Sequence, residues 1–188
     1  QPGTIAYSPD MLYKMLEETC MEISRNGFKK IIFVNGHGGN TYFLQYFCQT
    51  QLAKEREYSV YLFTPSVDAD TQKIIASMRK STTGGHADEG ESATMLVVRP
   101  DLVKMERTGD ESGADKNRLT LPNAYTAIWW YSKYPNHYAG DAAGAAEELG
   151  RVILEQRIEQ LSRVIKTVKE DKATMHLQKE FWRQTTGK

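Results

Sequence analysis

The stretch Lys30-Ile31-Ile32-Phe33-Val34-Asn35-Gly36-His37-Gly38-Gly39-Asn40 decides the fold of this 188-residue chain. Residues 31–34 are an unbroken apolar run, which predicts a strand over 30–34 that is buried on both faces, as in a parallel sheet. The polar, glycine-rich remainder predicts a loop at the carboxyl end of that strand. Because ligands bind at this edge of open α/β sheets, we expect residues 35–40 to be functional.

Helical and strand patterns alternate on both sides of this stretch. Ser8-Pro9-Asp10 reads as a helix start, and Gly27 as its carboxyl-terminal cap. A second helix is predicted after the loop, then a strand over 59–64 and a short helix over 70–78. Gly140-Asp141 is expected to open the longest helix, whose apolar face continues to residue 168. This order predicts an α/β fold with a mainly parallel sheet.

The length suits one domain, so we predict a single domain over 1–188 with a polar tail at 169–188. Lysine plus arginine and aspartate plus glutamate each number 24, which gives a formal net charge of zero. There is no basic surplus of the kind that binds nucleic acid. A neutral chain gains little from charge repulsion in staying monomeric, which favours a homo-oligomer.

No apolar run approaches the roughly 18 residues needed to cross a bilayer, so we expect no membrane partner. The expected location is the cytoplasm. However, the chain opens with Gln1 rather than Met, so a leader sequence cannot be judged and we expect a truncated piece.

His37 is the chemical centre of the first loop. Three glycines around it let the backbone approach a ligand closely, and an imidazole in a rigid loop suits a metal ligand or a proton carrier. One alternative is an ordinary polar surface histidine. Another is a loop that cradles phosphate before a helix, although the spacing matches neither G-x-G-x-x-G nor a Walker loop.

A second segment, Gly84-Gly85-His86-Ala87-Asp88-Glu89-Gly90-Glu91-Ser92, holds one histidine and three acids within six positions. If it continues as a helix from residue 88, Asp88 and Glu91 share one face and Glu89 points elsewhere. Imidazoles and carboxylates form zinc and manganese sites. Alternatively, the acids complement a helix dipole. That alternative explains Asp88 and Glu89 but not His86 or Glu91, which are therefore the stronger candidates.

An aromatic cluster follows later in the chain. Its members are Trp129, Trp130, Tyr131, Tyr134 and Tyr138. It suits a core or a subunit interface, or else a pocket wall or lid over a small planar substrate. His137 is a lesser candidate for reaching the same site.

Residues 35–40, followed by His86-Ala87-x-Glu89-x-Glu91-Ser92, resemble the creatininase (creatinine amidohydrolase) family motifs N-G-H-G-G-N and H-A-G-E-x-E-T. Pro2-Gly3-Thr4-Ile5 resembles the family's P-G-T-[IV] stretch. Gly140-Asp141, with Gly150 further on, resembles its later G-D-P segment. The resemblance covers residues 2 to about 150.

This resemblance implies a three-layer α/β sandwich and two divalent metals per site, Zn or Mn, with Fe also acceptable to such donors. It also implies hydrolysis of a small, often cyclic amide by a metal-activated water, and rings of subunits. His37 and Glu91 match metal ligands, and Glu91 is also expected to act in catalysis. His86 matches the histidine implicated in proton transfer.

Five further residues are expected to contact the substrate. Gly38 and Gly39 would leave room for it or place backbone N–H groups near a developing oxyanion. Asn40 closes the same motif, Asp88 adds a carboxylate near the site, and Trp130 is the aromatic candidate.

The sequence departs from the family pattern at several positions. Asp88 replaces Gly, Ser92 replaces Thr, and Ala142 replaces the Pro after Asp141. Creatininase itself carries a Glu where this chain has Gly39, so creatinine is not the default substrate.

The family's first metal motif, E-x-H-G with a later bridging Asp, lies upstream of P-G-T-I. We therefore expect the N-terminal part to be missing, and His37 and Glu91 alone cannot hold two metals. Two alternatives stay open. One is a non-catalytic α/β module that binds an anion or nucleotide at residues 36–40, and the other is a degenerate homologue that serves in an assembly.

Overall fold

The computed structural model describes residues 3–186. Gln1 and Pro2, where the match to P-G-T-[IV] begins, and residues 187–188 of the predicted tail lie outside the described residues. The chain forms two compact units: a sheet unit, Ile5–Ser66 with Glu159–Lys188, and a helical unit, Gln1–Thr4 with Val67–Ile158. The single domain over 1–188 stays a prediction.

Helix α1, Pro9–Arg25, opens the sheet unit with the predicted signals. The Ser8 hydroxyl caps it by accepting the Met11 N–H at 3.3 Å. Gly27 ends it with a φ of +97°, which a side chain at this position would disfavour. The N–H groups of Gly27 and Phe28 bond back to the carbonyls of Ser24 and Ile23, a Schellman ending.

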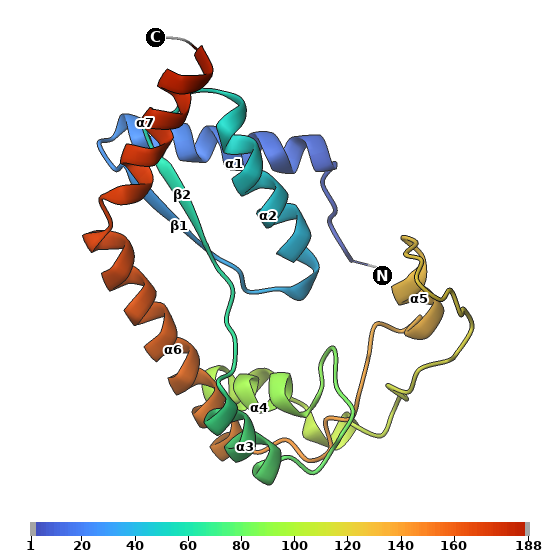
Figure 1. Ribbon diagram of the computed structural model, residues 1–188. Coiled ribbons are helices and arrows are strands. Elements are labelled where there is room, and N and C mark those ends of the chain that lie inside the picture. The colour runs from blue at the N-terminus through green and yellow to red at the C-terminus, as the bar shows by residue number, and fades with distance from the viewer. Residues whose placement is uncertain (1–2, 187–188) are drawn as a thin grey trace. The chain divides into compact units, whose positions relative to one another are not determined.

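Strands β1, Lys30–Val34, and β2, Ser59–Phe63, pair in parallel, with Ile31 opposite Val60. They run side by side in the same direction (Figure 1). Two helical pieces follow β1: the 3₁₀ turn η1, Gly38–Asn40, and helix α2, Thr41–Thr50. A 3₁₀ turn, η2 (Gln51–Ala53), leads on toward β2. The predicted parallel strand pair is confirmed.

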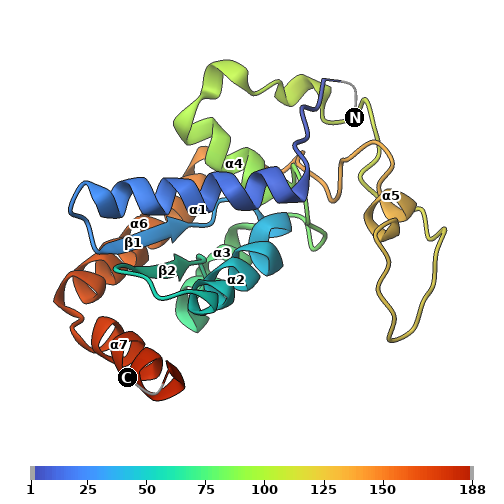
Figure 2. The same ribbon diagram turned by 90° about the horizontal axis from the view of Figure 1, so that it is seen from above.

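One face of this sheet packs against α1 and α2, which lie beside the strands in both views (Figures 1 and 2). The buried cluster joins Cys20 of α1, Phe47 of α2, Ile31 and Tyr58. The rings of Phe33 and Phe47 meet edge to face at 5.6 Å. Such aromatic and aliphatic burial is the main stabilising term of the unit.

The other face contacts the chain's C-terminal helices, α6 (Glu147–Glu170) and α7 (Ala173–Thr186). The Lys30 ammonium donates to the carbonyl of Val168 at 2.7 Å, and the Tyr61 hydroxyl donates to Asp171 at 2.7 Å. Gln178 of α7 donates to the Tyr58 carbonyl at 3.1 Å. The segment predicted as a polar tail therefore forms a helix that is bound to β2.

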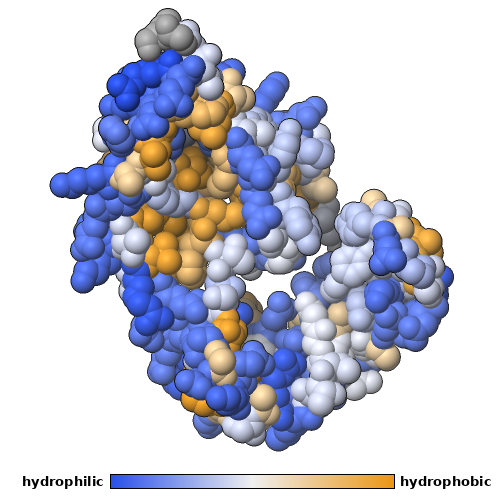
Figure 3. All heavy atoms as spheres, in the orientation of Figure 1, coloured by the Kyte–Doolittle hydropathy of each residue, from blue (hydrophilic) through white to orange (hydrophobic). Residues whose placement is uncertain are grey.

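Helices thus contact both faces of the described two-stranded sheet, whereas the three-layer sandwich stays a prediction. Burial on both faces of β1 was only partly right. Ile31 is buried, but Val34 at the end of the strand is 54% exposed. Figure 3 shows apolar side chains gathered on the visible face of the sheet unit, over the region of the strands.

The helical unit contains α3 (Ala69–Met78), α4 (Glu89–Val98), α5 (Trp129–Lys133) and the first part of α6. Two 3₁₀ turns, η3 (Pro100–Leu102) and η4 (Met105–Arg107), follow α4. The core of this unit consists of Ile75, Ala93, Leu149 and Ile153. A Cβ on Gly150 would stand 2.0 Å from the Ala93 carbonyl oxygen, so α4 and α6 pack closely where this glycine lies.

The prediction that Gly140-Asp141 opens the longest helix was wrong, because α6 begins at Glu147. Gly140 instead bridges to Gly113 with a φ of +116°, and the Asp141 carboxylate accepts the Ala143 N–H at 2.9 Å in a turn. Within residues 3–186, no helix has the length and apolar character that crossing a membrane requires.

Candidate active site

The first motif forms a loop held by the buried side chain of Asn35. Its backbone N–H continues the ladder to the Phe63 carbonyl at 2.8 Å. Its side-chain oxygen accepts the His37 N–H at 3.1 Å, and its amide donates to the Thr41 hydroxyl at 3.3 Å. One buried amide therefore fixes both ends of the turn that carries His37.

The imidazole of His37 is exposed and lies over the backbone of Gly39. A Cβ on Gly39 would stand 2.8 Å from His37 Cε1, so glycine makes room for the ring. Gly38 and Asn40 are exposed beside it. The structure thus brings together four of the predicted site residues in the sheet unit, around an imidazole that solvent and ligands can reach.

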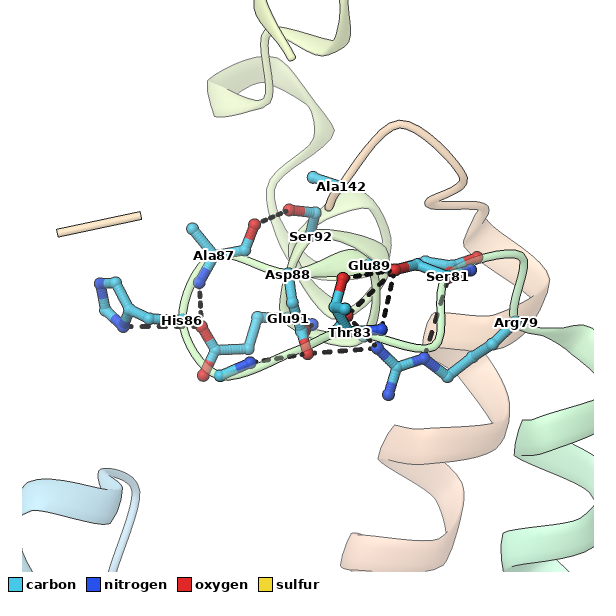
Figure 4. A network of polar contacts seen from close by, with 12 residues as sticks. Arg79, Ser81, Thr83, His86, Ala87, Asp88, Glu89, Glu91, Ser92 and Ala142 are labelled. Carbon is cyan, nitrogen blue, oxygen red and sulfur yellow. Dashed lines mark hydrogen bonds and ion pairs between the residues drawn. The ribbon is translucent and has the colours of Figure 1, made fainter. Parts of the chain in front are cut away.

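The second motif lies in the helical unit, at the start of α4 (Figure 4). Asp88 is the N-cap residue, and its carboxylate accepts the Glu91 N–H at 2.9 Å and the Gly85 N–H at 3.3 Å. Arg79 adds an ion pair at 3.3 Å. Asp88 thus has a structural role, as the helix-dipole alternative expected, and its predicted contact with substrate stays a prediction.

Glu89 is fully buried, at 0% exposure, and its carboxylate points away from Glu91 (Figure 4). It accepts the backbone N–H groups of Lys80 and Ser81 at 2.9 and 2.8 Å. The Arg79 guanidinium lies 3.8 Å from it. Burying a carboxylate without hydrogen-bond and ion-pair partners is costly, and these partners tie the loop at 79–81 to α4 through Glu89.

Glu91 differs from its two acidic neighbours because its side chain is 55% exposed. Its Oε2 accepts the Ala87 N–H at 2.7 Å and lies 3.8 Å from His86 Nδ1. Ala87 has a φ of +53°, a backbone conformation that residues other than glycine seldom adopt. The bend at Ala87 brings the His86 ring and the Glu91 carboxylate together.

A two-residue bridge fixes the backbone of His86. His86 and Ala139 exchange both N–H···O bonds, each at 3.0 Å. The segment that carries Ala139 also brings His137, whose ring centre lies 4.3 Å from that of His86. Trp130 of α5 completes the group, 6.3 Å from the His86 ring. Trp130 therefore lies beside one of the predicted catalytic residues.

The predicted site residues fall into two groups, one in each unit. The sheet unit carries the His37 group, and the helical unit carries His86, Asp88, Glu91 and Trp130. Among residues 3–186, no cluster of three or more histidine, cysteine or carboxylate side chains is arranged to hold a metal. The joint ligation of a metal by His37 and Glu91 stays a prediction.

Sequence reasoning missed two supporting residues. Arg79 binds both Asp88 and Glu89, yet no pattern connects it to a motif that begins several residues later. Asn35 was read as part of the loop rather than as its anchor. Its position directly after a buried strand is a signal that could have identified it, because a buried amide needs partners.

Comparison with known proteins gives a family-level match. The family model for creatininase, described as creatinine amidohydrolase, matches residues 1–165. No curated protein matches the chain.

Solved structures match over most of the chain. A protein from Bacteroides fragilis NCTC 9343, assigned to the creatinine amidohydrolases, has a TM-score of 0.73 and 16% identity over 90% of this chain and 66% of its own. A manganese creatininase has a TM-score of 0.68 and 21% identity over 89% of this chain and 67% of its own. A creatininase variant of the Zn-Zn type has a TM-score of 0.69 and 21% identity, with the same coverage.

At these identities the likeness shows the fold, and the expected creatininase-like α/β fold is confirmed. The chain spans about two thirds of the length of the structures that it matches.

Proposed function

We propose, from the premise that this chain belongs to the creatininase (creatinine amidohydrolase) family, that it carries part of the active site of a metal-dependent enzyme that hydrolyses a small amide. The observation that carries the proposal is the pairing of His86 with Glu91 at 3.8 Å. Three acids occupy this loop, and two of them are bound into the fold. Glu91 is the one whose carboxylate is exposed beside an imidazole.

The donor types fit a divalent cation. Imidazole nitrogen and carboxylate oxygen both bind Zn and Mn, and both His37 and Glu91 are exposed. A catalytic zinc normally takes three protein ligands, so the proposal requires donors beyond these two. Manganese and zinc forms are known for creatininases of this fold, which supports Zn or Mn over other cations, with two metals per site in the intact protein.

The bound metal would lower the pKa of a coordinated water to about 7 and polarise the substrate carbonyl. We assign proton delivery to the leaving nitrogen to His86, since an imidazole can both accept and donate a proton and Glu91 lies beside it. The N–H groups of Gly38 and Gly39 are the proposed donors to the developing oxyanion.

Substrate contact is assigned to Asn40, Asp88 and Trp130. Asn40 lies exposed in the His37 loop, and Trp130 offers a half-buried aromatic face beside His86. Because Asp88 caps α4, we expect its charge to act on the substrate only at a distance. A small amide, in many family members cyclic, is the proposed substrate class.

A non-catalytic or degenerate role in an assembly is the second candidate. One observation favours it: the described residues 3–186 contain no three-donor group that could hold a metal. Assembly as a homo-oligomer and a cytoplasmic location also remain proposals, and the oligomer can be measured by light scattering.

Manganese provides a direct test of the metal proposal. Mn²⁺ broadens the NMR signals of nuclei close to it, and the chain has only four histidines to follow. We expect the side-chain signals of His37 and His86 to broaden at Mn²⁺ concentrations that leave His176 sharp. Glu91→Gln and His37→Asn should each weaken the effect, whereas His176→Asn should not.

Equal broadening of all four histidines, or a pattern unchanged by Glu91→Gln, would overturn the metal assignment. The catalytic role is tested separately on a panel of small cyclic and linear amides with metal added. His86→Asn should lower kcat by about 10²–10⁴-fold if His86 transfers a proton. Metal binding without turnover of any amide in the panel would favour the non-catalytic candidate.

A further inference from the structure

His137 is the residue in the helical unit whose surroundings the proposed function does not use. Its ring contacts two other rings: His86 at 4.3 Å between centres, and Trp130 at 5.8 Å. The Trp130 indole N–H donates to His137 Nδ1 at 2.9 Å. The three rings contact one another in a triangle, since the centres of Trp130 and His86 also lie 6.3 Å apart.

The chemistry of the indole fixes the state of His137. Trp has a donor and no acceptor, so the proton of this bond belongs to Trp130, and His137 Nδ1 must carry a lone pair. A neutral imidazole has one N–H, and that proton must then reside on Nε2. Trp130 thus selects one of the two tautomers of His137.

A backbone bridge places His137 beside His86. Ala139 is the direct bridge partner of His86, and His137 stands two positions earlier, in the turn that leads into this bridge. The bridge therefore fixes the place at which the turn meets the His86 side chain. Gly85 permits the approach, because a Cβ there would lie 3.3 Å from the Ala139 Cβ and 3.9 Å from the Trp130 ring.

The turn that carries His137 is itself anchored. The His137 N–H bonds to the Tyr134 carbonyl at 3.0 Å, and the Tyr134 N–H bonds to that of Trp130 at 2.8 Å. Asn136 donates to the Ser112 carbonyl at 3.2 Å and to Glu111 at 2.7 Å. His137 adopts a φ of +66°, a conformation that costs on the order of 1–3 kcal/mol for a residue other than glycine. Strain of this kind persists where the surroundings define the conformation.

We propose that His137 is a positioning residue for His86: Trp130 fixes the tautomer of His137, and the His137 ring holds the ring of His86 beside Glu91. This role deepens, and rests on, the proton-transfer function proposed for His86. Without the neighbouring ring, the backbone of His86 would keep its bridge to Ala139. Its side chain would lose the packing contact that limits it to one rotamer. A proton carrier needs a defined direction, so such freedom would slow the transfer.

The primary test is side-chain NMR of the ¹⁵N-labelled full chain, which requires neither metal nor substrate. Above about pH 8, where imidazoles are neutral, we expect His137 with a bare Nδ1 and a protonated Nε2. Trp130→Phe keeps the aromatic ring and removes the donor. It should release His137 into a mixture of tautomers and shift the signals of His86, while His37 and His176 stay unchanged.

Trp129→Phe is the matched control. The Trp129 indole donates to the Tyr125 hydroxyl at 3.1 Å, and its ring packs on that of Trp130 at 5.4 Å, so Trp129→Phe alters the packing but keeps the donor to His137. The tautomer of His137 should then stay as in the wild-type chain. His137→Asn removes the second ring at little backbone cost, because asparagine tolerates a positive φ. It should shift His86 in the same way that Trp130→Phe does.

An Nδ1-protonated His137 in the wild-type chain, or His86 signals unaffected by both Trp130→Phe and His137→Asn, would overturn the proposal. Kinetic measurements on His137→Asn then distinguish the failure of the positioning role from the failure of the proposed hydrolase function. If His86 is a proton carrier, His137→Asn should lower kcat by on the order of 10–100-fold at constant KM. A chain that shows the NMR response without amide hydrolysis would keep the positioning role and refute the hydrolase.

Discussion

The two histidine loops use similar residues but are built in opposite ways. The loop after β1 is anchored by one buried amide, Asn35, and leaves His37 and its glycines exposed. The loop before α4 is anchored by two carboxylates and an arginine, and it exposes Glu91 beside His86. The comparison shows that composition does not separate a buried, multiply bonded acid from an exposed one. Glu91 accepts one backbone N–H, that of Ala87, and stays exposed, which is why we propose it as the metal-binding acid of this loop.

The strongest way to break this comparison is to remove Glu89. Glu89→Ala should lower the free energy of unfolding by about 3–5 kcal/mol, since it removes the acceptor of two backbone N–H groups and one of the two carboxylates that pair with Arg79. Denaturant unfolding measures the loss. The matched variant Glu91→Ala removes an exposed carboxylate two positions later and should cost about 1 kcal/mol or less. Equal losses of unfolding free energy in the two variants would mean that Glu89 is no more important for stability than Glu91.

The glycines extend the contrast. Gly140→Ala should cost about 1–3 kcal/mol, because Gly140 has a φ of +116° and a Cβ there would lie 2.9 Å from the Gly84 Cα. Backbone atoms on both sides of this contact cannot rotate away. Gly109→Ala is the control, since a Cβ at Gly109 meets nothing within 4 Å. A Gly140→Ala protein as stable as Gly109→Ala in thermal unfolding would show that the contact between Gly84 and Gly140 is loose.

The anchor of the sheet-unit loop should matter less. Asn35→Ala should cost about 1–2 kcal/mol, because it removes the side-chain bonds to the His37 N–H and the Thr41 hydroxyl from a buried position. Amide hydrogen exchange at His37 should accelerate as well. Asn40→Ala, at the exposed end of the same loop, should change neither quantity. If Asn40 proved the more costly of the two, the anchor would have been misidentified.

These contrasts also show how far the sequence alone could lead. Local signals predicted α1 and β1 and placed His86 and Glu91 in one short segment, because each depends on residues close together in the chain. The start of α6 was wrong because Gly140 and Asp141 are held by Gly113 and by a local turn, and no periodic pattern records such a bridge.

The burial of Glu89 and the ring contacts among Trp130, His137 and His86 depend on contacts between distant segments. An acid at the first position of a helix looks the same whether it faces solvent or Arg79. The aromatic cluster likewise gave no indication of which tryptophan would reach a histidine. Long-range packing decides such questions, and a single sequence carries little direct record of it.

The smallest effect on stability should come from Gly39→Ala, and it gives the sharpest view of the His37 loop. A Cβ there would meet His37 Cε1 at 2.8 Å and Nδ1 at 3.1 Å, but these atoms belong to an exposed side chain that can swing away. We therefore expect the free energy of unfolding to change by only about 0.5 kcal/mol, while the ring of His37 moves. Its NMR signals should shift, and its broadening by Mn²⁺ should decrease.

Gly38→Ala is the matched control, because a Cβ at Gly38 meets nothing within 4 Å. It should leave both the stability and the His37 ring as they are. A loss of about 2 kcal/mol or more in Gly39→Ala would place this glycine with Gly140, as a packing residue whose neighbours cannot yield. The His37 loop would then be as firmly built as the loop before α4, and the exposure of its imidazole would no longer distinguish the two.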